Sequence, residues 1–205
     1  MDSLKQSDTS LEDSSSLNRG LTVFELKMIA IITMFIDHVG AIIVPYLQSC
    51  TTQPGVIVLL EGIMTGMRLI GRLSFPIFAF LIVNGFYHTH SRKKYVLRLG
   101  VFAFISEPFF DLATSSSLLN WGHQNVFFTL FIGVAMMYAL EKSPQWQAKA
   151  AEVLLAMWAA SLLCSDYRYK GILLIAVYYF LRGRKREEFV LGAGWNFLWN
   201  WEIQG

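Results

Sequence analysis

Cysteine and charged residues are both scarce in this sequence. Its 205 residues include two cysteines, Cys50 and Cys164, and no CxxC spacing. This excludes a disulfide-rich scaffold and the common zinc motifs, so no metal is predicted, while a single bridge between the two cysteines stays open. Charged residues make up 16% of the chain and the net charge is +2. Because the basic residues form no separate domain, nucleic acid is not a predicted partner.

The start of the chain lacks the features of a cleavable signal peptide. It is Ser-rich, polar and partly acidic, without a basic beginning or a short apolar core. We therefore predict a disordered cytoplasmic tail over residues 1–22 and a single transmembrane domain over residues 23–205. The first apolar stretch would serve as an uncleaved signal anchor.

Apolar residues, in contrast, are abundant. They make up 54% of the chain, and the mean hydropathy of +0.44 is that of a protein with several membrane spans. A spanning helix needs about 20 apolar residues, which predicts an all-α, polytopic integral membrane bundle of about seven transmembrane helices. The stretch between Cys50 and Gly66 is short and interrupted by Glu61, so we predict an outer re-entrant or interfacial helix there. The predicted spans lie near residues 23–46, 69–88, 97–113, 125–140, 150–164, 169–181 and 188–201.

The basic loops predict an orientation. Lysine and arginine concentrate in residues 91–98, 141–149 and 182–188, and such loops face the cytoplasm. The N-terminus is then cytoplasmic, with membrane lipid around the spans. The two halves of the chain show no internal repeat, which argues against a secondary transporter built from inverted repeats.

Asp37 and His38 lie deep inside the first apolar stretch. Adjacent ionisable side chains are expensive to keep in a bilayer, so they indicate function. The imidazole of His38 can accept a proton near neutral pH, and Asp37, about 100° around the helix, can pair with an arginine of another helix. The alternative is that both side chains lock helices together by hydrogen bonds.

Arg68 and Arg72 lie four residues apart, on one face of a helix. Their guanidinium groups can hold a carboxylate or polarise a carbonyl. Alternatively, they are counter-ions for Glu107 and Asp111, which are also four apart and flank Pro108.

The remaining polar candidates form two groups. Toward the predicted outer side, solvent exposure is the alternative for His123, and helix capping is the alternative for Asn125 and for Asp166, which precedes Tyr167. At the cytoplasmic side, a basic cluster could bind the phosphates of a nucleotide-like cofactor or could simply fix the topology. This cluster contains His88, His90, Arg92, Lys93 and Lys94.

Together these motifs resemble the TraX family of bacterial membrane proteins, whose founding members belong to conjugation systems and are associated with N-terminal acetylation of pilin. The resemblance runs from Lys27 to about Gly183 and is distributed over the chain. More distantly, the chain is similar to the transmembrane acyltransferase superfamily, which has a histidine on an early helix and an arginine-rich segment before a proline. The motifs are KMIAIITMFIDHVGA, MRLIGRLSFPIFAFLIVNGFYHT, RKKYVLRL, FISEPFFDLA, NVFFTLFIG and SDYRYKGILLI.

The resemblance implies a protein of the bacterial inner membrane that moves an acyl group from cytoplasmic acetyl-CoA to an acceptor on the outer side. The acceptor would be an amine or a hydroxyl, on a protein N-terminus or a glycan. His38 would act as the general base, assisted by Asp37, while Arg72 or Arg68 stabilises the oxyanion. The basic cluster would hold the coenzyme A phosphates. The remaining outer residues, which would bind the substrate, are Glu107, Asp111, His123, Asn125, Asp166 and Tyr167.

Two other functions stay open. One is a small ion-coupled transporter that uses the same buried acidic and basic groups as a relay. The other is a membrane-embedded assembly subunit without enzymatic activity. The family pattern also continues into a further span with a Tyr-Pro-x-His-Leu sequence, which this chain does not contain. A pocket closed by that span would be incomplete here.

Overall fold

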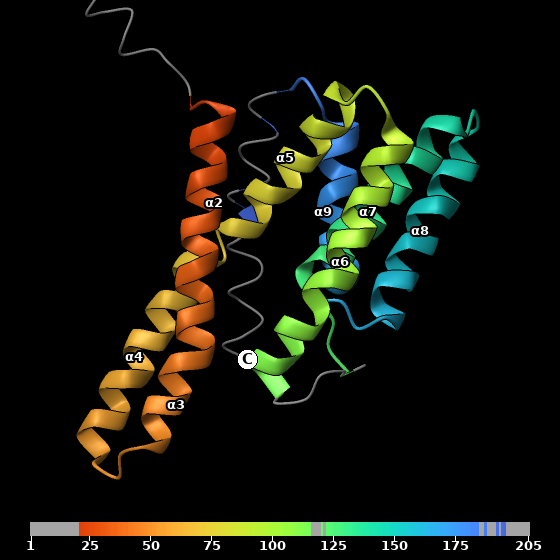
Figure 1. Ribbon diagram of the computed structural model, residues 1–205. Coiled ribbons are helices and arrows are strands. Elements are labelled where there is room, and N and C mark those ends of the chain that lie inside the picture. The colour runs from red at the N-terminus through yellow and green to blue at the C-terminus, as the bar shows by residue number, and fades with distance from the viewer. Residues whose placement is uncertain are drawn as a thin grey trace, which may run out of the picture.

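The computed structural model describes residues 21–115, 120, 122–184, 187, 192, 194 and 195. Over these residues the named elements are all helical (Figure 1). The predicted all-α class is therefore confirmed. The predicted tail over residues 1–22 and the predicted span near 188–201 fall largely outside the described residues.

The chain begins with a long helical hairpin. Its first arm consists of α2 (Val23–His38), the π-helical turn η1 (Val39–Ile43) and α3 (Val44–Ser49), and its second arm is α4 (Pro54–Gly71). Thr22 caps α2 through a capping box, in which its hydroxyl accepts from the Glu25 N–H and its own N–H donates to the Glu25 carboxylate. Pro54 opens α4 in the first turn, where a missing N–H does no harm.

A break between α4 and α5 (Ser74–His88) lies at Arg72 and Leu73. Pro76 follows in the first turn of α5 and has no N–H to donate to the carbonyl of Arg72. The Leu73 N–H donates to the carbonyl of Ile70, three residues back. The regular helix is therefore interrupted between the end of α4 and the beginning of α5.

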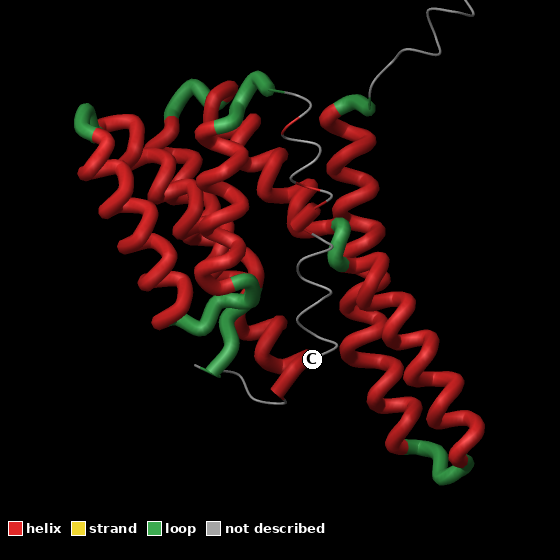
Figure 2. The backbone as a smooth tube through the Cα atoms, turned by 180° about the vertical axis from the view of Figure 1, so that it is seen from behind, coloured by secondary structure: helices red, strands yellow, loops and turns green. Residues whose placement is uncertain are grey.

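The remaining helices form a bundle with α5. They are α6 (Arg92–Ser115), α7 (Val126–Lys142), α8 (Trp146–Leu162) and α9 (Arg168–Phe180). Phe75, Ala79, Val83 and Phe86 recur every three or four residues on the buried face of α5, as an amphipathic helix requires. Figure 2 shows that the tip of the hairpin, with α3 and α4, extends beyond one end of this bundle. We call that end the site end and the opposite one the basic end.

Two helical stretches of the described chain are long and apolar enough to cross a membrane. They are Val23–Ser49, which joins α2, η1 and α3, and Pro54–His88, which joins α4 and α5 across their break; they have 27 and 35 residues. Many large apolar side chains, such as Phe35 and Phe109, lie at the surface, as expected where lipid rather than water surrounds a helix. The predicted number of seven spans is not confirmed. The short re-entrant helix predicted within residues 50–66 is instead the first part of the 18-residue α4.

Candidate functional site

An ion pair joins the two arms of the hairpin. Arg68 on α4 donates from Nη1 to Oδ2 of Asp37 on α2 at 2.6 Å. This confirms the prediction that Asp37 pairs with an arginine of a neighbouring helix. Gly71 makes the approach possible, because a Cβ at this position would lie 2.2 Å from the Cβ of Asp37.

His38 follows Asp37 on the same helix and is partly buried. Its Nδ1 lies 2.8 Å from the carbonyl oxygen of Met34. A carbonyl can only accept, so Nδ1 must carry the proton, and in the neutral ring Nε2 is then the basic nitrogen. The π-helical turn η1 begins at the next residue, and such turns occur often at functional sites.

Arg72 and Tyr167 extend this group toward the bundle. Arg72 interacts electrostatically with Tyr167, Asp37 and Asp166. The ring of Tyr167 stacks on Phe75 with the ring centroids 3.7 Å apart. The joint after α4 and the beginning of α9 therefore meet at the site end, with two guanidinium groups close to a phenol and two carboxylates.

Two loops at the site end are tied together. The Gln124 N–H donates to the carbonyl of Cys164 at 3.1 Å, and Nε2 of His123 lies 3.4 Å from Oδ1 of Asp166. The hydrogen bond to Asp166 raises the pKa of His123 above its ordinary value. The side chain of His123 is thus partly exposed to solvent, as predicted, and also contacts Asp166. Asp166 does not cap α9, since Tyr167 holds the N-cap position without a side-chain bond.

Glu107 on α6 and Asn125 form a buried polar contact. Asn125 donates from its backbone N–H and from Nδ2 to Oε2 of Glu107. Its Oδ1 accepts from the Phe127 N–H at 2.9 Å, which confirms the predicted helix cap. Oδ2 of Asp111 accepts from the Asn120 N–H at 2.7 Å. The alternative in which Arg68 is the counter-ion of Glu107 and Asp111 is wrong, because Arg68 pairs with Asp37.

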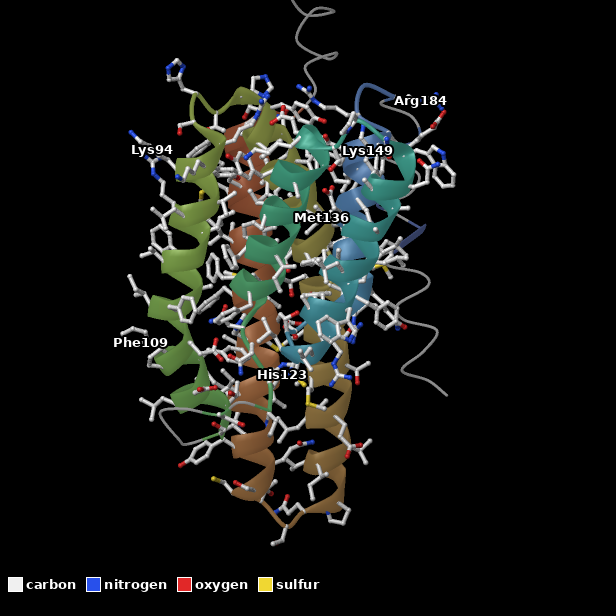
Figure 3. The ribbon with its side chains drawn as sticks, turned by 90° about the vertical axis from the view of Figure 1, so that its right-hand side faces the viewer. Lys94, Phe109, His123, Met136, Lys149 and Arg184 are labelled. Carbon is white, nitrogen blue, oxygen red and sulfur yellow. The ribbon has the colours of Figure 1, made fainter. Side chains whose placement is uncertain are left out.

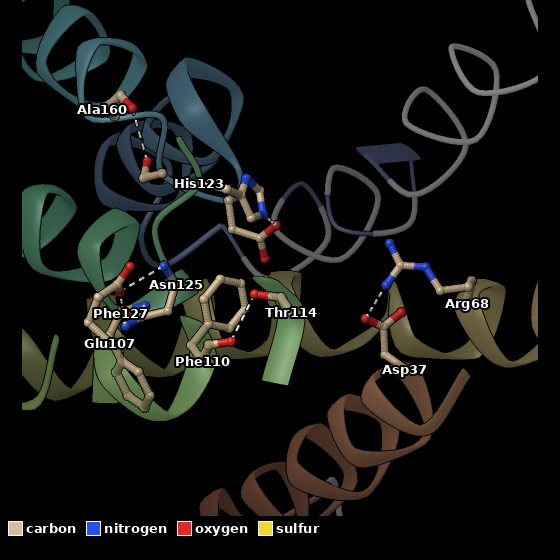
Figure 4. Close-up of polar contacts among 11 residues, drawn as sticks. Asp37, Arg68, Glu107, Phe110, Thr114, His123, Asn125, Phe127 and Ala160 are labelled. Carbon is tan, nitrogen blue, oxygen red and sulfur yellow. Dashed lines mark hydrogen bonds and ion pairs between the residues drawn. The ribbon is translucent and has the colours of Figure 1, made fainter. Parts of the chain in front are cut away.

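The polar residues predicted for the outer side therefore gather at the site end, in two groups (Figure 4). His123 lies between the groups, since it contacts Asp166 and also interacts electrostatically with Glu107. Among the described residues, no group of three or more His, Cys, Asp and Glu side chains is arranged to hold a metal ion. The first group contains Asp37, His38, Arg68, Arg72, Asp166 and Tyr167, and the second contains Glu107, Asp111, Asn120 and Asn125.

The predicted basic cluster lies at the opposite end, where Figure 3 labels Lys94. Lys93 and Lys94 are exposed, His90 lies in the α5–α6 loop, and His88 bonds through Nδ1 to the carbonyl of Asn84. Arg92 is not wholly available to a cofactor, because it pairs with Glu141 of α7.

Sequence reasoning missed Arg182 and Tyr87 at the basic end. The Arg182 guanidinium lies 3.6 Å from the centroid of the Tyr87 ring, and Tyr87 stacks in turn on Tyr179. Arginine on an aromatic face is a common recognition arrangement. The basic run after α9 was visible in the sequence, but nothing in the sequence indicated that Arg182 lies on the ring of Tyr87 in α5.

Comparison with known proteins identifies the family. The family model described as TraX protein matches residues 24–195. The chain belongs to the TraX family. It is 29% identical over 192 residues to the protein named probable fimbrial assembly protein FimC, serogroup H1, of Dichelobacter nodosus, covering 87% of this chain and 71% of that protein. It is 27% identical over 165 residues to protein TraX of Escherichia coli, covering 80% of this chain and 58% of that protein. No solved structure matches the chain.

Proposed function

We propose that this TraX family member is a membrane-embedded acyltransferase that moves an acyl group, most simply acetyl, from acyl-CoA to an amine or hydroxyl at the site end. The observation that carries the proposal is the state of His38. Its Nδ1–H is fixed on the carbonyl of Met34, which leaves Nε2 as a base beside the Asp37–Arg68 pair. A histidine held in one tautomer, whose charge interacts with that of the arginine-paired Asp37, is suited to acyl transfer.

The proposed chemistry needs these groups in distinct roles. Nε2 of His38 takes the proton of the acceptor as its nitrogen or oxygen attacks the thioester carbonyl. Arg72, whose charge interacts with those of Asp37 and Asp166, stabilises the oxyanion of the tetrahedral intermediate. The C–S bond then breaks, and the imidazolium returns the proton to the thiolate. Asp37 holds Arg68 and stabilises the imidazolium. The acceptor side is lined by the remaining polar residues of the site end, which are Tyr167, Asp166, His123, Asn125, Glu107 and Asp111.

The basic end supplies the complementary half of the proposal. By the positive-inside rule it faces the cytoplasm, in a bacterial inner membrane and with a cytoplasmic N-terminus. There His88, His90, Lys93 and Lys94 can bind the phosphates of the donor, together with Arg182. The length of α5, 15 residues, separates the two ends by about 20 Å, so the acyl group has to travel through the protein.

The buried core argues against the transporter alternative. Between the two ends, the described interior of α5, α7 and α9 consists of apolar side chains such as Val83, Met137 and Ile175. The buried polar side chains collect at the site end instead. An ion relay would need polar groups along the path.

An assembly subunit is the second candidate, favoured by the name of the relative from Dichelobacter nodosus. Such a subunit needs the fold but not the basic nitrogen of His38. It should therefore tolerate His38→Ala in any assay of fimbrial or pilus assembly, provided that the variant is inserted at the level of the wild type.

The deciding experiment measures acetyl-CoA binding and slow thioester hydrolysis by the purified protein in detergent. We expect saturable binding, and turnover that falls about 100-fold or more in His38→Ala and by a similar factor in Arg72→Ala. Glu61→Gln, at an exposed position of α4, is the matched control and should keep full turnover. Full turnover in His38→Ala would exclude the mechanism, and no binding at millimolar acetyl-CoA would favour the assembly subunit.

A further inference from the structure

Glu107 and Asp111, which the proposed function places on the acceptor side, form a buried carboxylate pair that takes no part in the proton-transfer and acyl-transfer steps. They lie one turn apart on the same face of α6. Only 7% and 1% of their surfaces are exposed. Two carboxylates so close and so buried repel each other unless a positive charge or a proton lies between them.

Each carboxylate has one oxygen that is bonded and one that is not. Oε2 of Glu107 accepts from Asn125, and Oδ2 of Asp111 accepts from Asn120. Oε1 of Glu107 and Oδ1 of Asp111 are buried without a hydrogen-bond partner among the residues that the structure describes. Buried polar atoms in folded proteins nearly always have a partner. The two oxygens therefore indicate a ligand.

Protein cations do not account for the pair. In the described part of the chain, no ion pair joins Glu107 or Asp111 to a lysine or arginine; Arg68 pairs with Asp37. His123 lies within electrostatic range of Glu107, but its Nε2 contacts Asp166. The two carboxylates thus carry up to two negative charges that the described side chains do not neutralise.

α6 and the two asparagines bonded to the carboxylates carry further oxygen acceptors. Pro108 lies between the two carboxylates in α6, and because it has no N–H, the carbonyl of Phe104 loses its usual helical donor. The side-chain oxygens of Asn120 and Asn125 each accept one backbone N–H and retain a second lone pair. Carboxylate, carbonyl and amide oxygens are the ligands of hard cations.

We propose that Glu107 and Asp111 bind a Ca²⁺ ion, which holds Asn120 and Asn125 against α6 and so positions His123. A divalent ion balances both charges, whereas Na⁺ leaves one uncompensated. Mg²⁺ prefers to keep several of its waters, and Ca²⁺ accepts an irregular shell of protein oxygens. This departs from the prediction that no metal binds, which was based on the number and spacing of the cysteines. The proposal does not rest on the acyltransferase function.

The test is equilibrium binding of radioactive ⁴⁵Ca²⁺ to the purified full chain in detergent, after removal of bound ions with a chelator. We expect saturable binding of one ion per chain. Thermal unfolding followed by tryptophan fluorescence should shift upward by about 5 °C when Ca²⁺ exceeds its Kd a hundredfold. Mg²⁺ and Na⁺ at equal ionic strength should give a much smaller shift.

Variants distinguish the pair from other acidic groups. Glu107→Gln and Asp111→Asn should each lower Ca²⁺ affinity at least tenfold and remove the thermal shift. Glu61→Gln, which removes an exposed acid, should leave both unchanged. Absence of saturable binding to the wild type would overturn the proposal whether or not the variants fold. A thermal shift caused by Na⁺ but not by Ca²⁺ would also overturn it. So would a Glu107→Gln variant that unfolds at a higher temperature than the wild type with or without Ca²⁺, because this would indicate that the two carboxyl groups share a proton rather than an ion.

Discussion

At the scale of single residues, the contact between His123 and Asp166 makes a prediction about pH. The carboxylate raises the pKa of His123 above about 6.5, so the folded protein favours the protonated ring. The contact therefore contributes stability that is fully present below about pH 6.5 and is lost as the pH rises through the raised pKa. Both side chains are 39–48% exposed, so we expect a contribution below about 1 kcal/mol.

The measurement is the difference in thermal midpoint between wild type and His123→Gln from pH 5.5 to 8.5. We expect a difference of about 1–3 °C at pH 5.5 that shrinks toward the alkaline end. In an Asp166→Asn background the difference should no longer depend on pH. A difference that grows with pH would contradict the assigned direction.

Residue pairing could be predicted from the sequence only in part. The cost of burying Asp37 predicted an arginine partner, and Arg68 is that partner. For Glu107 the same reasoning predicted arginine as one alternative, but the structure uses the neutral amide of Asn125. Charge balance limits what a buried carboxylate can accept, but it does not show which helix supplies the donor.

At the scale of helices, glycine controls the closeness of α2 and α4. A Cβ at Gly71 would fall 2.2 Å from that of Asp37, while a Cβ at Gly62 would meet nothing within 4 Å. Gly71→Ala should therefore push the arms apart and destabilise the protein by about 1–3 kcal/mol. Gly62→Ala should be neutral or slightly stabilising, since alanine is the better helix former.

These two variants should be compared by thermal unfolding in detergent. For a chain of this size we expect the midpoint of Gly71→Ala to fall by roughly 2–10 °C. The Asp37–Arg68 pair should loosen with it. If Gly71→Ala and Gly62→Ala behave alike, the packing of the hairpin does not depend on this close approach.

Helix boundaries were predictable where a local signal marks them. Asn125 and Pro54 mark the beginnings of α7 and α4, and both types of signal are readable in a sequence. The length of α4 was not predictable in this way. Glu61 interrupts its apolar pattern, so the segment was predicted as a short re-entrant piece, whereas packing against α2 and α3 maintains the helix through it.

At the scale of the whole molecule, the two ends differ in charge and in how far their helices extend. The first arm of the hairpin, Val23–Ser49, has 27 residues and so measures about 40 Å, more than the roughly 30 Å of a bilayer core. We therefore expect its tip to emerge from the hydrocarbon on the side of the site end. The basic end, with exposed Lys94, should face the cytoplasm.

Cysteine labelling in intact cells tests this orientation. Cys50 is exposed at the tip of the hairpin, so a membrane-impermeant maleimide should label it from outside once Cys164 has been replaced by alanine. In a Cys50→Ser, Cys164→Ala background, Lys94→Cys should react only after the membrane is permeabilised. Labelling of Lys94→Cys in intact cells would show that the orientation is the reverse of the one expected. Acetyl-CoA from the cytoplasm would then approach at the site end, on the side of His38.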